Sequence, residues 1–346
     1  MTKAGLLSLH RSVALVFAPL LLLQALTGAT LVFRGPLARM LDPSAMTALT
    51  PGPTAPIAEL AASAEARLPE YSLRRMYLPS SPGDVVFGEL ARADGSARFV
   101  SLDPVSARVL AAGPVWRFPL EAALRLHYRL LDGPAGLALV LANGIALTLL
   151  AASGLSFWWP GRGRALKSLA IRKIAPKRLK LRLWHRSCGV TISIVVLFSA
   201  TTGVLLVAPD LAASTGAAGS GPAPLRSFAR IDDAVAVARA QFPGAQLHDV
   251  RFPPTDKIDV NFLAPARNPR AFHIVSVSIS RTRVLERLPA ENNGILWMTV
   301  LPLHSGESFG LAGRLLLLVE AAVLVFLAIS GPTMWWRSRS GRRRRP

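Results

Sequence analysis

The sequence predicts an α-helical membrane protein. Its four transmembrane helices are expected to arise from a tandem duplication, with two small α+β modules on the outer side of the membrane. Three observations predict this fold class. The chain is 51% hydrophobic with a mean hydropathy of +0.38. It contains four long apolar runs, and its motifs recur in the same order in its two halves.

The four apolar runs are each long enough to cross a bilayer, since a hydrocarbon layer of about 30 Å needs about 20 helical residues. Only the last run contains a charged residue, Glu320. The first run is too long for a signal-peptide core and has no small-residue cleavage pattern after it, so we expect an uncleaved helix. The runs are 12–33, 133–159, 187–209 and 315–336.

The net charge of +20 is concentrated in three short segments without any acidic residue. The connector 160–186 has ten Lys or Arg residues, the tail 337–346 has six, and Lys3 and Arg11 lie at the N-terminus. The rest of the chain is nearly neutral. This distribution follows the positive-inside rule and places both termini and the connector in the cytoplasm. It indicates contact with the lipid bilayer and no nucleic-acid partner.

Two long segments, 34–129 and 210–303, are then expected on the periplasmic side. Each begins with a linker rich in Pro, Gly, Ala and Ser and continues with a helical pattern and strand-like runs. The expected helices are 57–68 and 231–242, and the expected strands are 85–90, 98–102, 258–263 and 272–279. Both segments later contain Arg-Val-Leu, at 108–110 and 283–285.

These patterns divide the chain into eight parts. They are the N-terminus with the first span (1–33), the first outer module (34–126), the second span (127–159), the basic connector (160–184), the third span (185–209), the second outer module (210–302), the fourth span (303–336) and the basic tail (337–346).

Four histidines occupy matching places in the two halves. His10 and His185 open the first and third spans and are therefore expected near the cytoplasmic face. His127 and His304 precede the second and fourth spans and are expected near the outer face. Each face thus receives two histidines from two helices, as bis-histidine ligation of haem iron requires. Duplication alone would also copy one boundary histidine into two, so an ordinary interfacial role remains an alternative.

The sequence lacks the motifs of a zinc site and of covalent haem attachment, and this limits the nature of the cofactor. Neither face offers the acid or cysteine cluster that would complete a tetrahedral zinc site. The single cysteine, Cys188, excludes an intramolecular disulfide and a Cys-x-x-Cys-His attachment motif. Any haem would therefore be non-covalent and b-type. Arg11 and Arg186, directly after the inner histidines, are candidate partners for haem propionates, although topology alone also places Arg there.

Other repeated positions allow two interpretations. Ser153-Gly154 matches Ser330-Gly331, and Thr27-Gly28 matches Thr202-Gly203. Small residues allow helices to approach closely, and a bulky cofactor between helices needs the same space. Glu320 is expected either to carry a proton coupled to electron transfer or to be neutral and hydrogen-bonded between helices.

The order Leu-His-Arg-Ser at the first span, an outer α+β module, then Leu-His before a span ending in Ser-Gly-x-x-x-Trp-Trp occurs twice. From Leu9 to Trp336 this order resembles the PepSY-associated transmembrane proteins, which include iron-regulated membrane proteins and inner-membrane ferric-siderophore reductases. The resemblance implies four spans, outer PepSY-like modules, and two haem b groups bound through His10, His185, His127 and His304. The outer modules depart from the family pattern, since they are divergent and rich in Pro and Ala.

The expected function is electron transfer across the bacterial inner membrane. A quinol or a cytoplasmic reductase would supply the electron, and a ferric siderophore or other ferric chelate would receive it in the periplasm. The chain has no Gly-x-Gly-x-x-Gly fingerprint for a nicotinamide or flavin domain. Two alternatives remain: a membrane-anchored binding or sensor module without redox activity, and a transporter built from the internal repeat.

Overall fold

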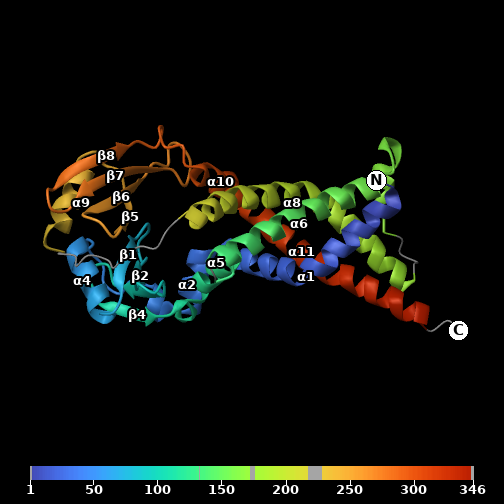
Figure 1. The fold of residues 1–346 in the computed structure, drawn as a ribbon, viewed down its shortest axis with the longest axis horizontal. Coiled ribbons are helices and arrows are strands. Elements are labelled where there is room, and N and C mark those ends of the chain that lie inside the picture. The colour runs from blue at the N-terminus through green and yellow to red at the C-terminus, as the bar shows by residue number, and fades with distance from the viewer. Residues whose placement is uncertain (1, 132, 172–175, 217–227, 344–346) are drawn as a thin grey trace. The chain divides into compact units, whose positions relative to one another are not determined.

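The structure, a computed structural model, describes residues 2–131, 133–171, 176–216 and 228–343. The chain divides into two compact units. The helical unit comprises residues 1–32, 123–215 and 303–346, and the sheet unit comprises residues 33–122 and 216–302. Each unit is therefore assembled from segments that are far apart in the sequence (Figure 1).

Four long helices make up most of the helical unit: α1 (Lys3–Leu31), α6 (Pro134–Trp158), α8 (Lys177–Gly216) and α11 (Gly310–Arg343). Each contains or largely covers a stretch that is apolar and long enough to cross a membrane, namely Lys3–Leu31, Pro134–Trp158, Leu179–Ser214 and Glu307–Arg339. The four predicted spans are confirmed, and the protein is a multi-pass membrane protein. A helix satisfies all its own backbone hydrogen bonds, which is why an apolar run of this length adopts it in lipid.

The long helices extend beyond the apolar runs, and this changes the setting of two histidines. Helix α1 begins at Lys3, where the Thr2 hydroxyl accepts a hydrogen bond from the Gly5 amide as an N-cap. His10 therefore lies about two turns inside α1, and His185 lies similarly inside α8. Their backbones are held by regular helix on both sides.

The four helices form a closed ring of neighbours. Helix α1 packs against both α6 and α11. Helices α6 and α8 approach closely at Gly144, where an added Cβ atom would lie 2.9 Å from Val204. Helices α8 and α11 meet at Gly189, which faces Leu327, and at Ser199, which bonds to Glu320. The order α1, α6, α8, α11 places α1 diagonally opposite α8, and α6 diagonally opposite α11.

Short helices precede α6 and α11 and carry the other two histidines. These are α5 (Pro119–Arg129), with His127, and α10 (Leu296–His304). After α5 the chain turns through Leu130 and Leu131, which both have positive φ (49° and 64°), and α6 begins after Gly133. The helix that carries His127 is therefore interrupted before the second span begins. Because each of these helices is separate from the span that follows, its histidine can reach sideways to a neighbouring helix.

The sheet unit contains one antiparallel sheet of eight strands in the order β4-β3-β2-β1-β5-β6-β7-β8. The two expected modules are joined through β1 and β5, where Met76 lies opposite Val250 and Tyr77 opposite Asp249. The strands are β1 (Ser72–Tyr77), β2 (Val86–Ala91), β3 (Ala97–Leu102), β4 (Val109–Gly113), β5 (Leu247–Arg251), β6 (Lys257–Leu263), β7 (Phe272–Ser278) and β8 (Arg283–Leu288). Pairing of β1 with β5 satisfies backbone groups that would otherwise form an exposed edge in each half.

One face of this sheet packs on α4 (Ile57–Arg67) and α9 (Ile231–Arg239). Apolar residues alternate along the strands and meet apolar residues of both helices in a single core, in which Leu60, Val250 and Phe262 are fully buried. The remaining short elements are the helices α2 (Arg34–Leu41), α3 (Pro43–Met46) and α7 (Ala165–Ser168), and the 3₁₀ turns η1 (Val115–Arg117), η2 (Arg162–Arg164), η3 (Phe228–Arg230) and η4 (Glu307–Phe309).

Candidate cofactor site

His127 is held by two groups on α1. Its Nδ1 atom lies 3.1 Å from the Gln24 carbonyl oxygen and 3.1 Å from Thr27 Oγ1. A carbonyl can only accept, and the Thr27 hydroxyl already donates to the Leu23 carbonyl at 2.8 Å. Nδ1 must therefore carry the ring proton. The lone pair of His127 then lies on Nε2, which is the atom left to bind a metal.

His304 has the same environment in the second half. Its Nδ1 lies 3.1 Å from the Ser199 carbonyl and 3.0 Å from Thr202 Oγ1, both on α8. The Thr202 hydroxyl donates to the Phe198 carbonyl at 2.9 Å. The same reasoning places the proton on Nδ1 and the lone pair on Nε2. Hydrogen bonds of this kind fix the orientation and raise the basicity of metal-binding histidines.

The rings of His127 and His304 lie close together, with centres 6.3 Å apart and planes inclined at 45°. Two imidazoles on opposite sides of one metal ion have centres about 6 Å apart when each nitrogen binds at about 2.0–2.1 Å. The observed separation suits such an arrangement. The structure thus brings together the two histidines that the sequence assigned to one face.

His10 and His185 are hydrogen-bonded to serine hydroxyls, where His127 and His304 are hydrogen-bonded to threonine hydroxyls. His10 Nδ1 lies 2.9 Å from Ser153 Oγ on α6, and His185 Nδ1 lies 2.7 Å from Ser330 Oγ on α11. Each hydroxyl points its own hydrogen toward a carbonyl one turn back in its helix, that of Leu150 at 3.2 Å or Leu327 at 3.4 Å. These two histidines are therefore also held with Nδ1 protonated and Nε2 available.

A glycine lies against each of the four imidazoles. An added Cβ atom would lie 3.0 Å from His127 Cε1 at Gly28, and 3.3 Å from His304 Cε1 at Gly203. The corresponding distances are 3.3 Å from His10 at Gly154 and 3.6 Å from His185 at Gly331. The recurring Thr-Gly and Ser-Gly dipeptides thus have one structural use. The hydroxyl residue binds the ring nitrogen, and the glycine leaves room for the ring.

The histidines form two levels of the bundle. Along α1, several helical turns separate His10 from Thr27, the partner of His127, and along α8 the same interval separates His185 from Thr202. With a helical rise of about 1.5 Å per residue, the two levels lie about 25 Å apart. At each level the two histidines come from different halves of the chain, on diagonally opposite helices or on the short helices that lead into them.

The match to known families covers almost the entire helical and sheet units. The model of the PepSY-associated TM region matches residues 7–338. The chain belongs to this family. No curated protein matches the chain.

Other candidate residues of this PepSY-associated protein lie near the two levels. Glu320 is 3% exposed on α11 and accepts a hydrogen bond from the Ser199 hydroxyl. The backbone carbonyl of the same residue, Ser199, accepts from His304 Nδ1. In the first half of the chain, Asn143 occupies the position that matches Glu320, and Gln24 occupies the position that matches Ser199. Asn143 Oδ1 and Gln24 Nε2 are buried without a hydrogen-bond partner.

The two candidate propionate partners differ. Arg11 is exposed on α1. Arg186 donates from Nη2 to the Ser168 carbonyl of the connector, while its Nε atom is buried without a partner. Part of the Arg186 guanidinium therefore fastens the connector to α8.

The remaining histidines have partners in the sheet unit. His248 Nδ1 lies 2.9 Å from Asp249 Oδ2, and His273 Nδ1 accepts from the Ala290 amide at 2.9 Å. Within the described ranges no three His, Cys, Asp or Glu side chains gather as a metal site. The candidate metal ligands of the bundle are therefore pairs of imidazoles. Two axial ligands are all that haem iron needs from the protein.

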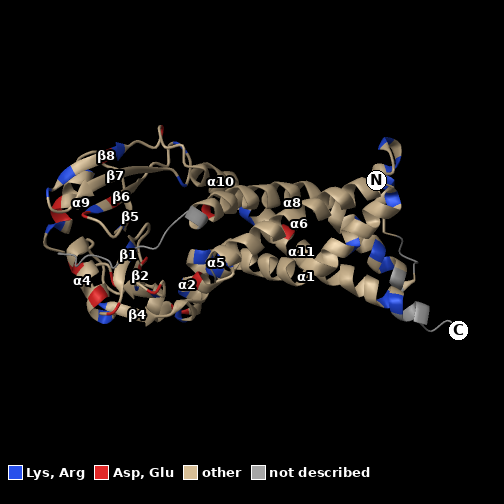
Figure 2. Cartoon of the chain, viewed as in Figure 1, with Lys and Arg blue, Asp and Glu red and all other residues tan. Residues whose placement is uncertain are grey.

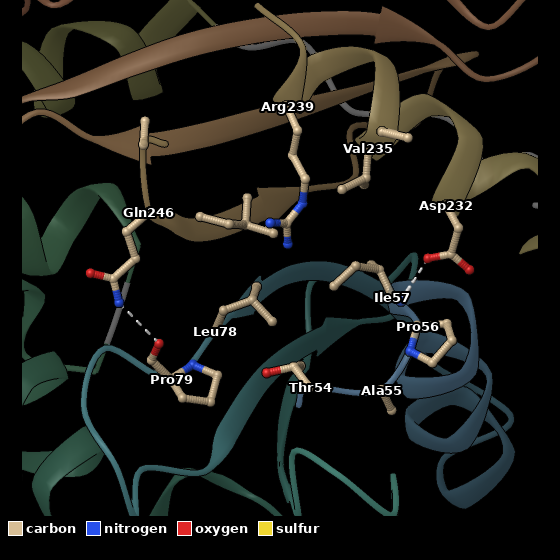
Figure 3. A pocket seen from close by; sticks show the side chains of 13 residues that line it. Thr54, Ala55, Pro56, Ile57, Leu78, Pro79, Asp232, Val235, Arg239 and Gln246 are labelled. Carbon is tan, nitrogen blue, oxygen red and sulfur yellow. Dashed lines mark hydrogen bonds between the residues drawn. The ribbon is translucent and has the colours of Figure 1, made fainter. Parts of the chain in front are cut away.

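The sheet unit contains a cavity of about 390 Å³, whose lining side chains are drawn in Figure 3. It lies where α9 faces the start of α4, and the Arg239 guanidinium points into it over an apolar floor that includes Leu78 (Figure 3). Asp232 lines one end and accepts from the Ile57 amide at 2.7 Å, which joins α9 to the N-terminus of α4. The cavity is part of the joint between the two halves of this unit.

Proposed function

We propose that this protein is a dihaem electron-transfer protein of the bacterial inner membrane that reduces ferric siderophores or other ferric chelates on the periplasmic side. The observation that carries the proposal is the His127–His304 pair, with ring centres 6.3 Å apart and both Nε2 lone pairs free. His10 and His185 would hold the second haem b. The matching halves are interpreted as a tandem duplication.

The side chains around each histidine perform separate tasks in this proposal. Gln24, Thr27, Ser199 and Thr202 orient the outer pair through Nδ1, and Ser153 and Ser330 orient the inner pair. The apolar faces of the four helices exclude water from both levels. Bound haem would supply reversible one-electron chemistry of its iron. Arg11 and the free part of Arg186 are candidate partners for its propionates.

The orientation follows from charge. Lys and Arg gather at the end of the bundle where α1 begins and α11 ends (Figure 2). By the positive-inside rule this end faces the cytoplasm. The His10 and His185 level would then receive electrons from the cytoplasmic side, and the sheet unit would be periplasmic. Fe(II) binds hard oxygen ligands more weakly than Fe(III), so reduction there would release the iron.

We assign Glu320 a packing role between α8 and α11, because the Ser199 hydroxyl donates to it. An intramembrane carboxyl group is costly and needs such a partner.

The proposal is tested by purifying the full chain in detergent and recording a reduced-minus-oxidised spectrum with pyridine extraction. Two b-type haems per chain are expected. The protein in liposomes should then reduce an external ferric hydroxamate once its inner face is supplied with electrons. Absence of haem from protein expressed with ample haem would overturn the proposal, and haem without ferric reduction would restrict it to another acceptor.

A further inference from the structure

We propose that a groove between α8 and α11 binds an isoprenoid hydroquinone, which donates electrons to the His10 and His185 level. This inference rests on the proposed function and identifies its electron donor. The groove has a volume of about 370 Å³. Half of its lining, Phe326, Ile329, Ser330 and Thr333, lies inside the apolar run 315–336, and the other half, Lys180, Leu181, Trp184 and Arg337, lies at the basic border of the apolar runs. A ligand with an apolar tail would therefore enter from the membrane and keep its polar ring at this border.

The groove touches the inner histidine level directly. Ser330 forms part of its wall, and the same Ser330 hydroxyl holds His185 Nδ1 at 2.7 Å. Trp184, the residue before His185, is half exposed and forms another part of the wall. Only the Ser330 side chain would separate a hydroquinone ring bound here from His185, a proposed iron ligand.

The lining suits a planar aromatic ring with an apolar tail. Trp184, Phe326 and Ile329 supply aromatic and aliphatic surface, and pockets for such ligands combine this surface with few polar groups. The polar groups are the hydroxyls of Ser330 and Thr333, with Lys180 and Arg337 also lining the groove.

The hydroxyls favour the reduced form of a quinone. Ser330 donates its hydrogen to the Leu327 carbonyl, and Thr333 donates to the Ile329 carbonyl at 2.7 Å. Both oxygens can therefore only accept from a ligand. A hydroquinone has two O–H groups to donate, whereas a quinone has none. The two basic side chains would stabilise the hydroquinone anion that forms as a proton leaves.

The reaction balances with the ferric chelate as oxidant. One hydroquinone loses two electrons and two protons and becomes a quinone. The two electrons pass singly and reduce two Fe(III) ions to Fe(II), and the two protons leave to water at the basic end of the bundle. The quinone cannot donate to Ser330 or Thr333, so it loses these two hydrogen bonds and returns to the membrane.

The first half does not repeat this lining, although it repeats the Ser153–His10 hydrogen bond. At the positions that match Trp184 and Lys180 the chain has Leu9 and Gly5. At those that match Phe326 and Arg337 it has Leu149 and Pro160. At these four positions the aromatic and basic residues therefore occur only in the second half, although both halves hold a histidine through a serine hydroxyl.

The test uses the full chain in nanodiscs with an azido-quinone as photoprobe and peptide mapping by mass spectrometry. We expect labelling of peptides from 179–186 and 326–337, competed by decylubiquinol. The double variant W184L/F326L, which installs the first-half residues, should lose about tenfold in labelling because both aromatic contacts with the quinone ring are removed. The matched control L9A/L149A should label normally. Thr333→Val, which removes only a hydroxyl, should weaken competition by decylubiquinol more than competition by decylubiquinone.

Labelling elsewhere, or labelling unchanged in W184L/F326L, would overturn the inference. Competition by phosphatidylglycerol but not by decylubiquinol would assign the groove to an anionic lipid instead. These outcomes do not need haem, so they are separable from the proposed function. If haem is present and a cytoplasmic reductase drives ferric reduction while no quinone labels the groove, only the donor assignment fails.

Discussion

His127 and His304 belong to different halves of the sequence, yet their imidazole centres lie 6.3 Å apart. Each ring is fixed from the side by a neighbouring long helix, His127 by α1 and His304 by α8. Both Nδ1 atoms are occupied by acceptors, so both Nε2 atoms are available. The pair is held in place before any ligand binds, which reduces the ordering cost of binding a metal between the rings.

Alanine at either His127 or His304 should remove the same haem. Each iron is expected to need both axial imidazoles, so both variants should fall from two haems to one per chain by pyridine extraction. His10→Ala and His185→Ala should each remove the other haem, and His248→Ala, in the sheet unit, should keep both. A variant at one level that lost both haems, or neither, would contradict pairing by level.

The serine hydroxyls that hold His10 and His185 should control how well the haem at this level is retained. Ser153→Ala and Ser330→Ala each remove the group that accepts from a histidine Nδ1. Loss of such a partner costs about 10–100-fold in metal affinity or activity. Haem transfer to apomyoglobin would measure the change in affinity.

The control for these variants is Ser156→Ala. Its hydroxyl donates to the Ala152 carbonyl on an exposed part of α6. Equal haem loss from Ser156→Ala and Ser153→Ala would refute an orienting role for the Ser153 hydroxyl.

Alanine substitution of the four glycines should have graded effects. Gly28→Ala places a methyl group 3.0 Å from His127 Cε1, so the ring must shift. At Gly331 the distance is 3.6 Å, an ordinary contact, and Gly331→Ala should be tolerated. Haem content and the redox midpoint of the affected haem should change most for Gly28→Ala and least for Gly331→Ala. The reverse order would indicate that the glycines serve helix packing rather than the rings.

The membrane helices could be predicted from sequence because their cause is local. An apolar run without charge can only bury its backbone polar groups in lipid by forming a helix. The positions of the histidines followed from the same runs. Which ring nitrogen carries the proton could not be predicted from the runs. It depends on the carbonyls of Gln24 and Ser199, which are distant in the sequence from His127 and His304. The repeated Ser-Gly and Thr-Gly pairs were the sequence feature that marked the histidine partners. Their spacing alone was equally consistent with close helix packing and with space for a cofactor.

The strands β2, β3, β6 and β7 were predicted almost to the residue, whereas β1, β4, β5 and β8 were not. Two of the missed strands, β1 and β5, lie at the centre of the sheet and carry charged residues, and Arg75 and Asp249 would be costly to bury singly. They compensate each other across the strand pair, at 2.8 Å between Arg75 Nε and Asp249 Oδ1. That pairing joins residues from opposite halves of the chain, so no local pattern could reveal it. For the same reason the two modules were expected to be separate and are instead one sheet.

The Asp249 carboxylate should make the sheet sensitive to acid. It is fully buried and accepts from Arg75, from His248 and from Asn261 Nδ2 at 3.0 Å. Burial alone would raise the pKa of Asp249, but the hydrogen bond from His248 and the charge of Arg75 outweigh it and lower the pKa to about 2. Because the folded pKa lies below the unfolded value of about 3.9, the ionised carboxylate stabilises the fold above about pH 4 by about 2 kcal/mol.

That stabilisation should be lost as the pH falls from about 4 to about 2. Hydrogen exchange of the β1 and β5 amides in the full chain, corrected for the intrinsic rate, would measure it. Asp249→Asn should already exchange faster at neutral pH, since Arg75 loses its ionised partner, and should lose most of the acid dependence. Asp94→Asn, which breaks an exposed pair with Arg92, should leave both quantities unchanged. If Asp249→Asn kept the acid dependence of the original protein, another carboxyl group would be responsible for it.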